Sequence, residues 1–157
     1  MKISGINPET GEKFETDASD VNEEFIQSMS DFKMTDGEVK KLIDSLDVSA
    51  DIKSGLYMIS KTTIKAGQFV LKVGRKIIDF VALTFKEYPT ASFGMIFGAI
   101  IGFLITAIPI LGAVLGPLVT PILIALGLIV GLYNDIQDKA LLRKITEINA
   151  NFSALNT

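Results

Sequence analysis

Cysteine, histidine and tryptophan are all absent from this chain of 157 residues. Without cysteine the protein has neither a disulfide framework nor a thiolate nucleophile. Without histidine it lacks the side chain that most often serves as a general base and as a metal ligand. The sequence also contains no glycine-rich phosphate loop and no paired carboxylates in an apolar setting. These absences predict that the protein is not an enzyme and binds no metal or cofactor.

A further absence is local, because residues 88–134 contain no Asp, Glu, Lys or Arg. A helix rises 1.5 Å per residue, so about 20 apolar residues are needed to cross the hydrocarbon core of a bilayer, which is about 30 Å thick. This uncharged segment is long enough for two helices with a turn between them. It predicts a hydrophobic, transmembrane-type helical hairpin over 93–133, with Tyr88 and Tyr133 at the two ends of the uncharged segment.

The two arms of this hairpin differ in length. The first arm, 93–111, carries eleven Leu, Ile, Val or Phe residues, which contribute roughly −3 to −7 kcal/mol to membrane insertion. Thr120 followed by Pro121 is typical of a helix start, and a second arm beginning there would be only about 20 Å long. The second arm therefore either begins nearer Leu115 and kinks at its prolines, or lies tilted, shallow or re-entrant. The side chains expected to insert are Phe93, Ile96, Phe97, Ile100, Ile101, Phe103, Leu104, Ile105, Ile122, Leu123, Leu126 and Ile129.

Glycines recur at intervals of four residues in the uncharged segment. Residues four apart share one face of a helix, so each arm presents a strip on which another backbone can approach closely. The strips contain Gly94, Gly98 and Gly102, then Gly112 and Gly116, and then Gly127 and Gly131. Two interpretations are open: the arms pack on each other, or the strips form contacts between protomers of a homo-oligomer.

The charge of −3 is distributed unevenly, since residues 1–51 carry a net charge of −8 and residues 52–87 a net charge of +5. Residues 1–18 are expected to form an extended or disordered acidic arm, or a weak hairpin about 7–11. Capping-box spacings predict short amphipathic helices over 21–33 and 38–47, with Ser49 placed to cap a third helix. A single helical domain is thus expected to occupy 19–157.

The third helix is predicted over 52–87, with an apolar face, a basic face, and possible breaks at Gly67 or Gly74. A basic amphipathic helix is typical of a membrane-surface element, in which each Lys or Arg near anionic headgroups contributes about 1 kcal/mol. The residues expected to contact anionic lipid are Lys61, Lys65, Lys72, Arg75 and Lys76. In the alternative interpretation the apolar face is core and the lysines are merely solvated. Nucleic acid is not expected as a partner, because the chain is acidic and has no recognised binding motif.

A last amphipathic helix is predicted over 135–155. Two passes of the hairpin would leave both termini on the same side of the membrane, and the positive flanks make that side cytoplasmic. The junction from 128–135 into Lys139 and 144–149 resembles the passage from hairpin to last helix in pore-forming colicins. The resemblance covers about 88–150. It implies a helical bundle that buries the hairpin in solution and inserts it into the bacterial inner membrane.

The predicted fold is therefore all-α, with amphipathic helices around or beside a transmembrane-type hairpin. The predicted function is insertion into a bilayer, with pore formation or membrane perturbation, in an assembly built on the glycine strips. The alternative is a resident structural protein of a membrane, such as a virion-membrane, ejection or holin-like protein. The partner in either case is a lipid bilayer, most simply an anionic one in a bacterial inner membrane or a virion.

Overall fold

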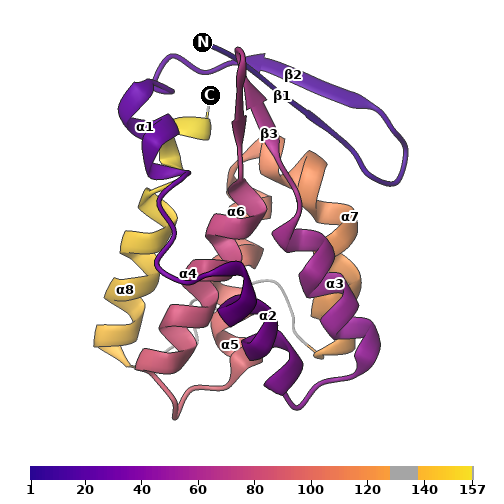
Figure 1. Cartoon of the computed structure of the whole chain (residues 1–157), viewed down its shortest axis with the longest axis vertical. Helices are drawn as coiled ribbons and strands as arrows, with labels where there is room; N and C mark the ends of the chain where they lie inside the picture. Colours follow the sequence, from indigo (N-terminus) through magenta and orange to yellow (C-terminus); the bar gives the residue numbers. More distant parts are fainter. Residues whose placement is uncertain (128–137, 157) are drawn as a thin grey trace.

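A four-stranded antiparallel sheet covers one end of a cluster of helices (Figure 1). The computed structural model describes residues 1–127 and 138–156 of the chain. The strands are β1 (Lys2–Ile6), β2 (Lys13–Asp17), β3 (Ile64–Ala66) and β4 (Phe69–Leu71), in the spatial order β2-β1-β3-β4. The prediction of an all-α fold is wrong. The sequence pattern did not reveal the sheet because its central contact pairs Ile3 with Ala66, residues that lie far apart in the chain.

Each half of the sheet is a hairpin whose turn contains a glycine with positive φ. In the first hairpin Gly11 has φ +74°, and the Asn7 side chain accepts backbone hydrogen bonds from Glu9 and Thr10. In the second, Gly67 has φ +60° and is the first of two residues between the paired ends of β3 and β4, as type II′ turns favour. Most of residues 1–18 are therefore paired in a sheet.

The prediction of one basic helix over 52–87 is also wrong. This part of the chain forms two helices, α3 (Ala50–Ser60) and α4 (Val73–Glu87), with β3 and β4 between them. Ile64 and Leu71 are seven residues apart, which is also the spacing of residues that share one helix face. In the structure they are buried partners directly opposite each other on the two strands, so the same spacing satisfies a hairpin. The chain reverses at Gly67, so these residues form a hairpin and not one continuous helix.

The remaining cover consists of short helices whose starts are capped by polar side chains. These helices are α1 (Glu23–Ser28), α2 (Asp36–Ser45) and α8 (Lys139–Ala150), followed by a short 3₁₀ turn (Ser153–Leu155). Thr35 and Glu38 form the predicted capping box of α2, and Ser49 caps α3 as predicted. Asn22 caps α1, and Asp138 caps α8. α1 is shorter than the expected 21–33, and α2 lies within two residues of the expected 38–47 at each end.

The uncharged segment forms a helical hairpin that turns earlier than expected. Its first arm contains α5 (Phe93–Phe97), a π-helical turn (Gly98–Gly102) and α6 (Phe103–Ala107), and its second arm is α7 (Pro109–Ala125). Ile108 is extended and Pro109 is the first residue of α7, so the chain reverses here rather than between 112 and 120. Within the described residues, none of the helices combines the length and the apolar character needed to cross a membrane. The predicted transmembrane-type hairpin is corrected accordingly, since its arms are only 15 and 17 residues long.

Glycines mark the points where α7 contacts the rest of the molecule. A Cβ added at Gly5 of β1 would lie 2.4 Å from Val114 Cγ2, and one at Gly55 of α3 would lie 2.7 Å from Ile122 Cδ1. The two arms meet at Gly112, where an added Cβ would lie 2.5 Å from the Ile105 carbonyl oxygen. Close packing of this kind makes the hairpin the centre of one continuous apolar core.

Candidate functional site

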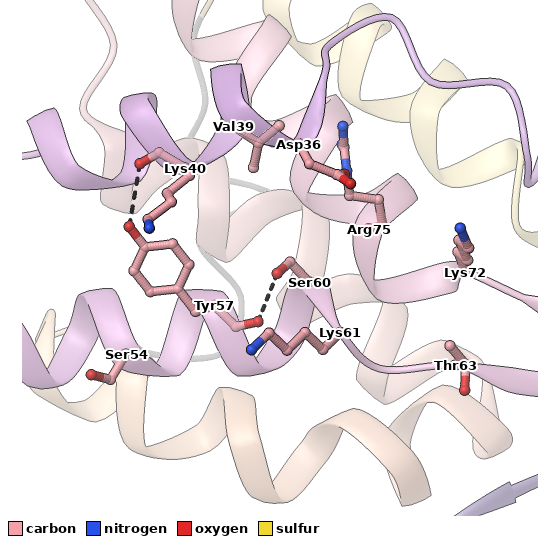
Figure 2. Close-up of a pocket in the computed structure, with 10 residues that line it drawn as sticks. All are labelled: Asp36, Val39, Lys40, Ser54, Tyr57, Ser60, Lys61, Thr63, Lys72 and Arg75. Carbon is pink, nitrogen blue, oxygen red and sulfur yellow. Dashed lines mark hydrogen bonds and ion pairs between the residues drawn. The ribbon is translucent and has the colours of Figure 1, made fainter.

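A groove of about 720 Å³ lies between α2, α3 and the start of α4 (Figure 2). In this view α2 forms its upper wall and α3 its lower wall, with Arg75 and Lys72 at the end nearest α4. The lining residues are Asp36, Val39, Lys40, Ser54, Tyr57, Ser60, Lys61, Thr63, Lys72 and Arg75. Four of these carry positive charge and one carries negative charge. The groove is therefore cationic, although the chain as a whole is acidic.

Three lysines of the groove are exposed and come from three different segments. Lys40 lies on α2, Lys61 follows the last residue of α3, and Lys72 precedes the first residue of α4. Among the residues that the structure describes, none of the three forms an ion pair. Their ammonium groups are thus available to a ligand.

Arg75, in contrast, is buried, and each of its three side-chain nitrogens contacts an acceptor in the protein. Its Nε donates to Asp36 Oδ1 at 2.9 Å, its Nη1 lies 3.4 Å from Asp79 Oδ1, and its Nη2 donates to the Met34 carbonyl. The guanidinium also stacks 4.7 Å from the centroid of the Phe32 ring. The hydrogen bond from Arg75 holds the pKa of the exposed Asp36 carboxyl below its usual range. Arg75 therefore shapes the groove, and its Nε, Nη1 and Nη2 each already contact an acceptor within the protein.

Lys76 also turns inward. Its ammonium donates to the Asp31 carbonyl and lies 5.2 Å from the Phe80 ring centroid, and burial lowers the pKa of Lys76. Asp79 accepts the backbone N–H groups of Met34 and Lys33 at 3.1 and 3.4 Å. We call Arg75, Lys76 and Asp79 the clamp, since together they hold residues 31–36 against α4.

The five cations expected to meet anionic lipid are thus divided. Lys61 and Lys72 line the groove, and Lys65 lies exposed on β3 outside it, beside a second hollow. Arg75 and Lys76 belong to the clamp and are mostly shielded from solvent. The sequence analysis missed Lys40, although its spacing from Asp36 places the two residues on one face of α2.

Tyr57 lies at the floor of the groove, with its hydroxyl directed at α2. The hydroxyl is 3.3 Å from the Lys40 carbonyl and also donates to the Asp44 carboxylate. The hydrogen bond to Asp44 is the main reason that the pKa of Tyr57 is raised to about 12. Ser60 donates to the Tyr57 carbonyl at 2.6 Å, as the dashed line in Figure 2 shows.

This contact gives a pH prediction. Because the pKa of folded Tyr57 lies above the usual tyrosine value near 10, its hydrogen bond stabilises the fold below that pH and the stabilisation is lost as the pH rises toward 12. Tyrosine ionisation can be followed by absorbance in the wild type and in Tyr57→Phe. The difference between the two titration curves reports Tyr57 alone and should have its midpoint near pH 12. The midpoint should fall in Asp44→Asn, which removes the charged acceptor. A wild-type midpoint near 10 would show that the hydrogen bond does not form.

The residues expected to insert into a membrane are mostly enclosed. Ile96, Phe97, Ile100, Ile101, Leu104, Ile122 and Leu123 are buried, while Phe93, Ile105 and Leu126 are half-buried. Gly94, Gly98 and Gly102 are half-buried on the first arm, and a Cβ at Gly102 would meet no atom within 4 Å in the part of the chain that the structure describes. Gly127 ends α7 with φ +70°. Ile129 and Gly131 lie outside the described residues.

The exposed positions of the hairpin carry no charge. Phe103 is 44% exposed and Ile124 is 70% exposed. The other exposed residues of the hairpin and its end are Thr106, Pro109, Thr120, Pro121, Ala125 and Gly127. A helix at the surface of a globular protein normally has charged and polar residues on its solvent face. This hairpin departs from that pattern.

Comparisons with protein-family models, with curated proteins and with solved structures each returned no match. What can be inferred of the function therefore comes from the chain's own residues. Two features stand out: a cationic groove whose three lysines form no ion pair with the residues described, and a central hairpin without charge even where it reaches solvent.

Proposed function

We propose that this protein acts on lipid bilayers by transferring its central hairpin, residues 93–125, from the protein core into the membrane. The observation that carries the proposal is the absence of charge from the hairpin's exposed positions, Phe103 and Ile124 among them. A helix at the surface of a globular protein normally carries polar or charged residues at such positions. The proposed activity is perturbation of the membrane, up to formation of a pore.

The energetics of transfer favour this segment over any other part of the chain. Each Leu, Ile, Phe or Val contributes about −0.3 to −0.6 kcal/mol to insertion, whereas each charged residue carried along would cost about 2.5–3.5 kcal/mol. The hairpin has many of the first kind and none of the second. Its arms of 15 and 17 residues suit a shallow or re-entrant insertion from one side.

Transfer requires the cover to separate from the hairpin. α7 contacts β1 at Gly5 and α3 at Gly55, so both the sheet and α3 must move. The apolar side chains exposed by this opening would be covered again by lipid. The half-buried Gly102, with open space beside it, is available for a contact between inserted copies.

A reversible crosslink tests the opening. If Gly5 and Val114 are both replaced by cysteine, their Cβ atoms lie about 3.7 Å apart, which is within the range for a disulfide. No other disulfide can form within one chain, because the chain has no native cysteine. The reduced protein should float with vesicles containing phosphatidylglycerol and release an entrapped dye, whereas the oxidised protein should bind without releasing dye.

The redox pair serves as its own control, since the two forms have the same sequence. Equal release by both forms would contradict separation of β1 from α7. If neither form floats, the proposed membrane activity is wrong. Protein that is recovered only in the membrane fraction of its host and releases no dye would instead support a resident structural role in a bacterial or virion membrane.

A further inference from the structure

We infer that the groove between α2, α3 and α4 is a binding site for a phosphate monoester or diphosphate, carried either by a lipid headgroup or by a free phosphorylated compound. The inference does not depend on insertion of the hairpin. It comes from three lysines that are separate in the sequence and line one groove, from Lys40 beside Tyr57 to Lys72 at the end nearest α4 (Figure 2).

First, the groove carries a net positive charge. Lys40, Lys61 and Lys72 line it without an ion pair in the described part of the chain, and the sole lining carboxylate, Asp36, is bonded to Arg75. Residues 1–51 contain thirteen acidic side chains, so partners for these lysines were available in the sequence. Gathering like charges at one site costs free energy, and a bound anion would offset that cost.

The second step is the supply of hydrogen-bond donors. Ser54 and Thr63 also line the groove, at its two ends in Figure 2, and each carries a hydroxyl group that is able to donate a hydrogen bond. Lys72 immediately precedes α4, a helix of 15 residues whose start has no side-chain cap among the described residues and no acidic residue in its first turn. The partial positive charge of this helix start adds to that of the lysines.

The third step is the shape of the groove. A volume of about 720 Å³ lies within the range of small-molecule sites. Lysine ammonium groups bind phosphate as compact point charges. Three lysines suit a ligand with two or more negative charges better than they suit a ligand with a single carboxylate. Val39 and the Tyr57 ring provide an apolar wall beside these groups, against which the organic part of the ligand can pack.

Arg75 acts here as a positioning residue. Its hydrogen bonds to Asp36 and the Met34 carbonyl fix the start of α2 against the first turn of α4. This contact determines the distance between the walls that carry Lys40 and Lys72. The ligand itself is held by the lysines and hydroxyls.

The test uses inorganic pyrophosphate as the probe, with sodium chloride at matched ionic strength as the reference. Pyrophosphate should raise the thermal midpoint of the wild type and bind measurably by calorimetry. The groove variant Lys40→Gln/Lys61→Gln/Lys72→Gln should bind on the order of 100-fold more weakly, from about 1 kcal/mol for each lysine. The matched control is Lys33→Gln/Lys41→Gln/Lys65→Gln. It has the same net charge as the groove variant, but its three substitutions lie outside the groove, so it should bind pyrophosphate as the wild type does.

Vesicles distinguish the two sources of the phosphate. Stronger, groove-dependent binding to phosphatidate vesicles than to phosphatidylglycerol vesicles would support a lipid headgroup. Pyrophosphate binding with no preference between the vesicles would support a free phosphorylated compound. Equal binding by the groove variant and its control, or no binding of either probe, would overturn the inference.

A failure of hairpin insertion would leave this result unaffected. The oxidised Gly5→Cys/Val114→Cys protein, in which insertion is blocked, should still bind pyrophosphate as strongly as its reduced form. The two proposals can therefore fail separately.

Discussion

Replacing Asp79 with alanine is expected to lower the free energy of unfolding by about 3–5 kcal/mol, since removing one partner of a buried ion pair leaves the other uncompensated. Asp79 is 1% exposed and accepts hydrogen bonds from Arg75 and from the backbone N–H groups of Lys33 and Met34. Its loss would leave these donors without their acceptor and weaken the attachment of residues 31–36 to α4. A loss of this size is a large part of the total stability of a domain.

Urea unfolding followed by circular dichroism measures this effect. Asp36→Ala is the matched control, because it removes the exposed carboxylate that is bonded to the same guanidinium. It should cost only about 0–1 kcal/mol, as exposed ion pairs do. Asp79→Asn should fall between the two, since its amide oxygen can still accept a hydrogen bond. Equal losses at Asp36 and Asp79 would show that the buried clamp does not stabilise the fold.

Gly74→Ala should destabilise the protein by about 3 kcal/mol or more, at or beyond the upper end of overpacking effects. The added Cβ would lie 1.8 Å from the Ile59 carbonyl oxygen, so the backbones of α3 and α4 would have to separate. The hydrogen bond from the Gly74 N–H to the Thr62 carbonyl, 3.1 Å long, would be strained at the same time. Because this contact also fixes Lys61 relative to Lys72, the affinity of the groove for pyrophosphate should fall.

Gly102→Ala is the control for that substitution, because an added Cβ there meets no atom of residues 1–127 or 138–156 within 4 Å. Exchange of a helical glycine for alanine should stabilise the monomer by about 0.5–1 kcal/mol. In the same urea assay, Gly74→Ala is therefore expected to lower the free energy of unfolding and Gly102→Ala to raise it. A destabilised Gly102→Ala, or a neutral Gly74→Ala, would contradict the packing described for α3, α4 and the first arm.

Features that depend on neighbouring residues were well predicted from the sequence. The capping box of Thr35 and Glu38 and the cap at Ser49 formed as expected, because the groups they join are only three residues apart. The uncharged segment forms a helical hairpin in the described residues, but its turn lies at Ile108. Pro109 can begin a helix, and Pro117 and Pro121 are tolerated inside α7, so prolines alone did not locate the turn.

The sheet and the groove could not be predicted in this way. β3 and β4 occupy a stretch whose apolar spacing fits a helix and a hairpin equally, and β1 adds to β3 across a long loop of chain. Lys61 and Lys72 were recognised as basic residues of one expected helix, but that helix does not exist. The chain reversal at Gly67 brings them, together with Lys40 of α2, to the same groove.

The sequence alone determined the absence of thiol and imidazole chemistry, the uncharged central segment and the capped starts of the short helices, since these depend on composition or on residues within one turn. The tertiary structure alone decided that the hairpin is enclosed by a sheet and amphipathic helices, that Arg75 and Lys76 are internal, and that three lysines line one groove. The physical reason is that pairing and packing between distant segments depend on the closure of long loops. No local pattern of residues records the outcome of that closure.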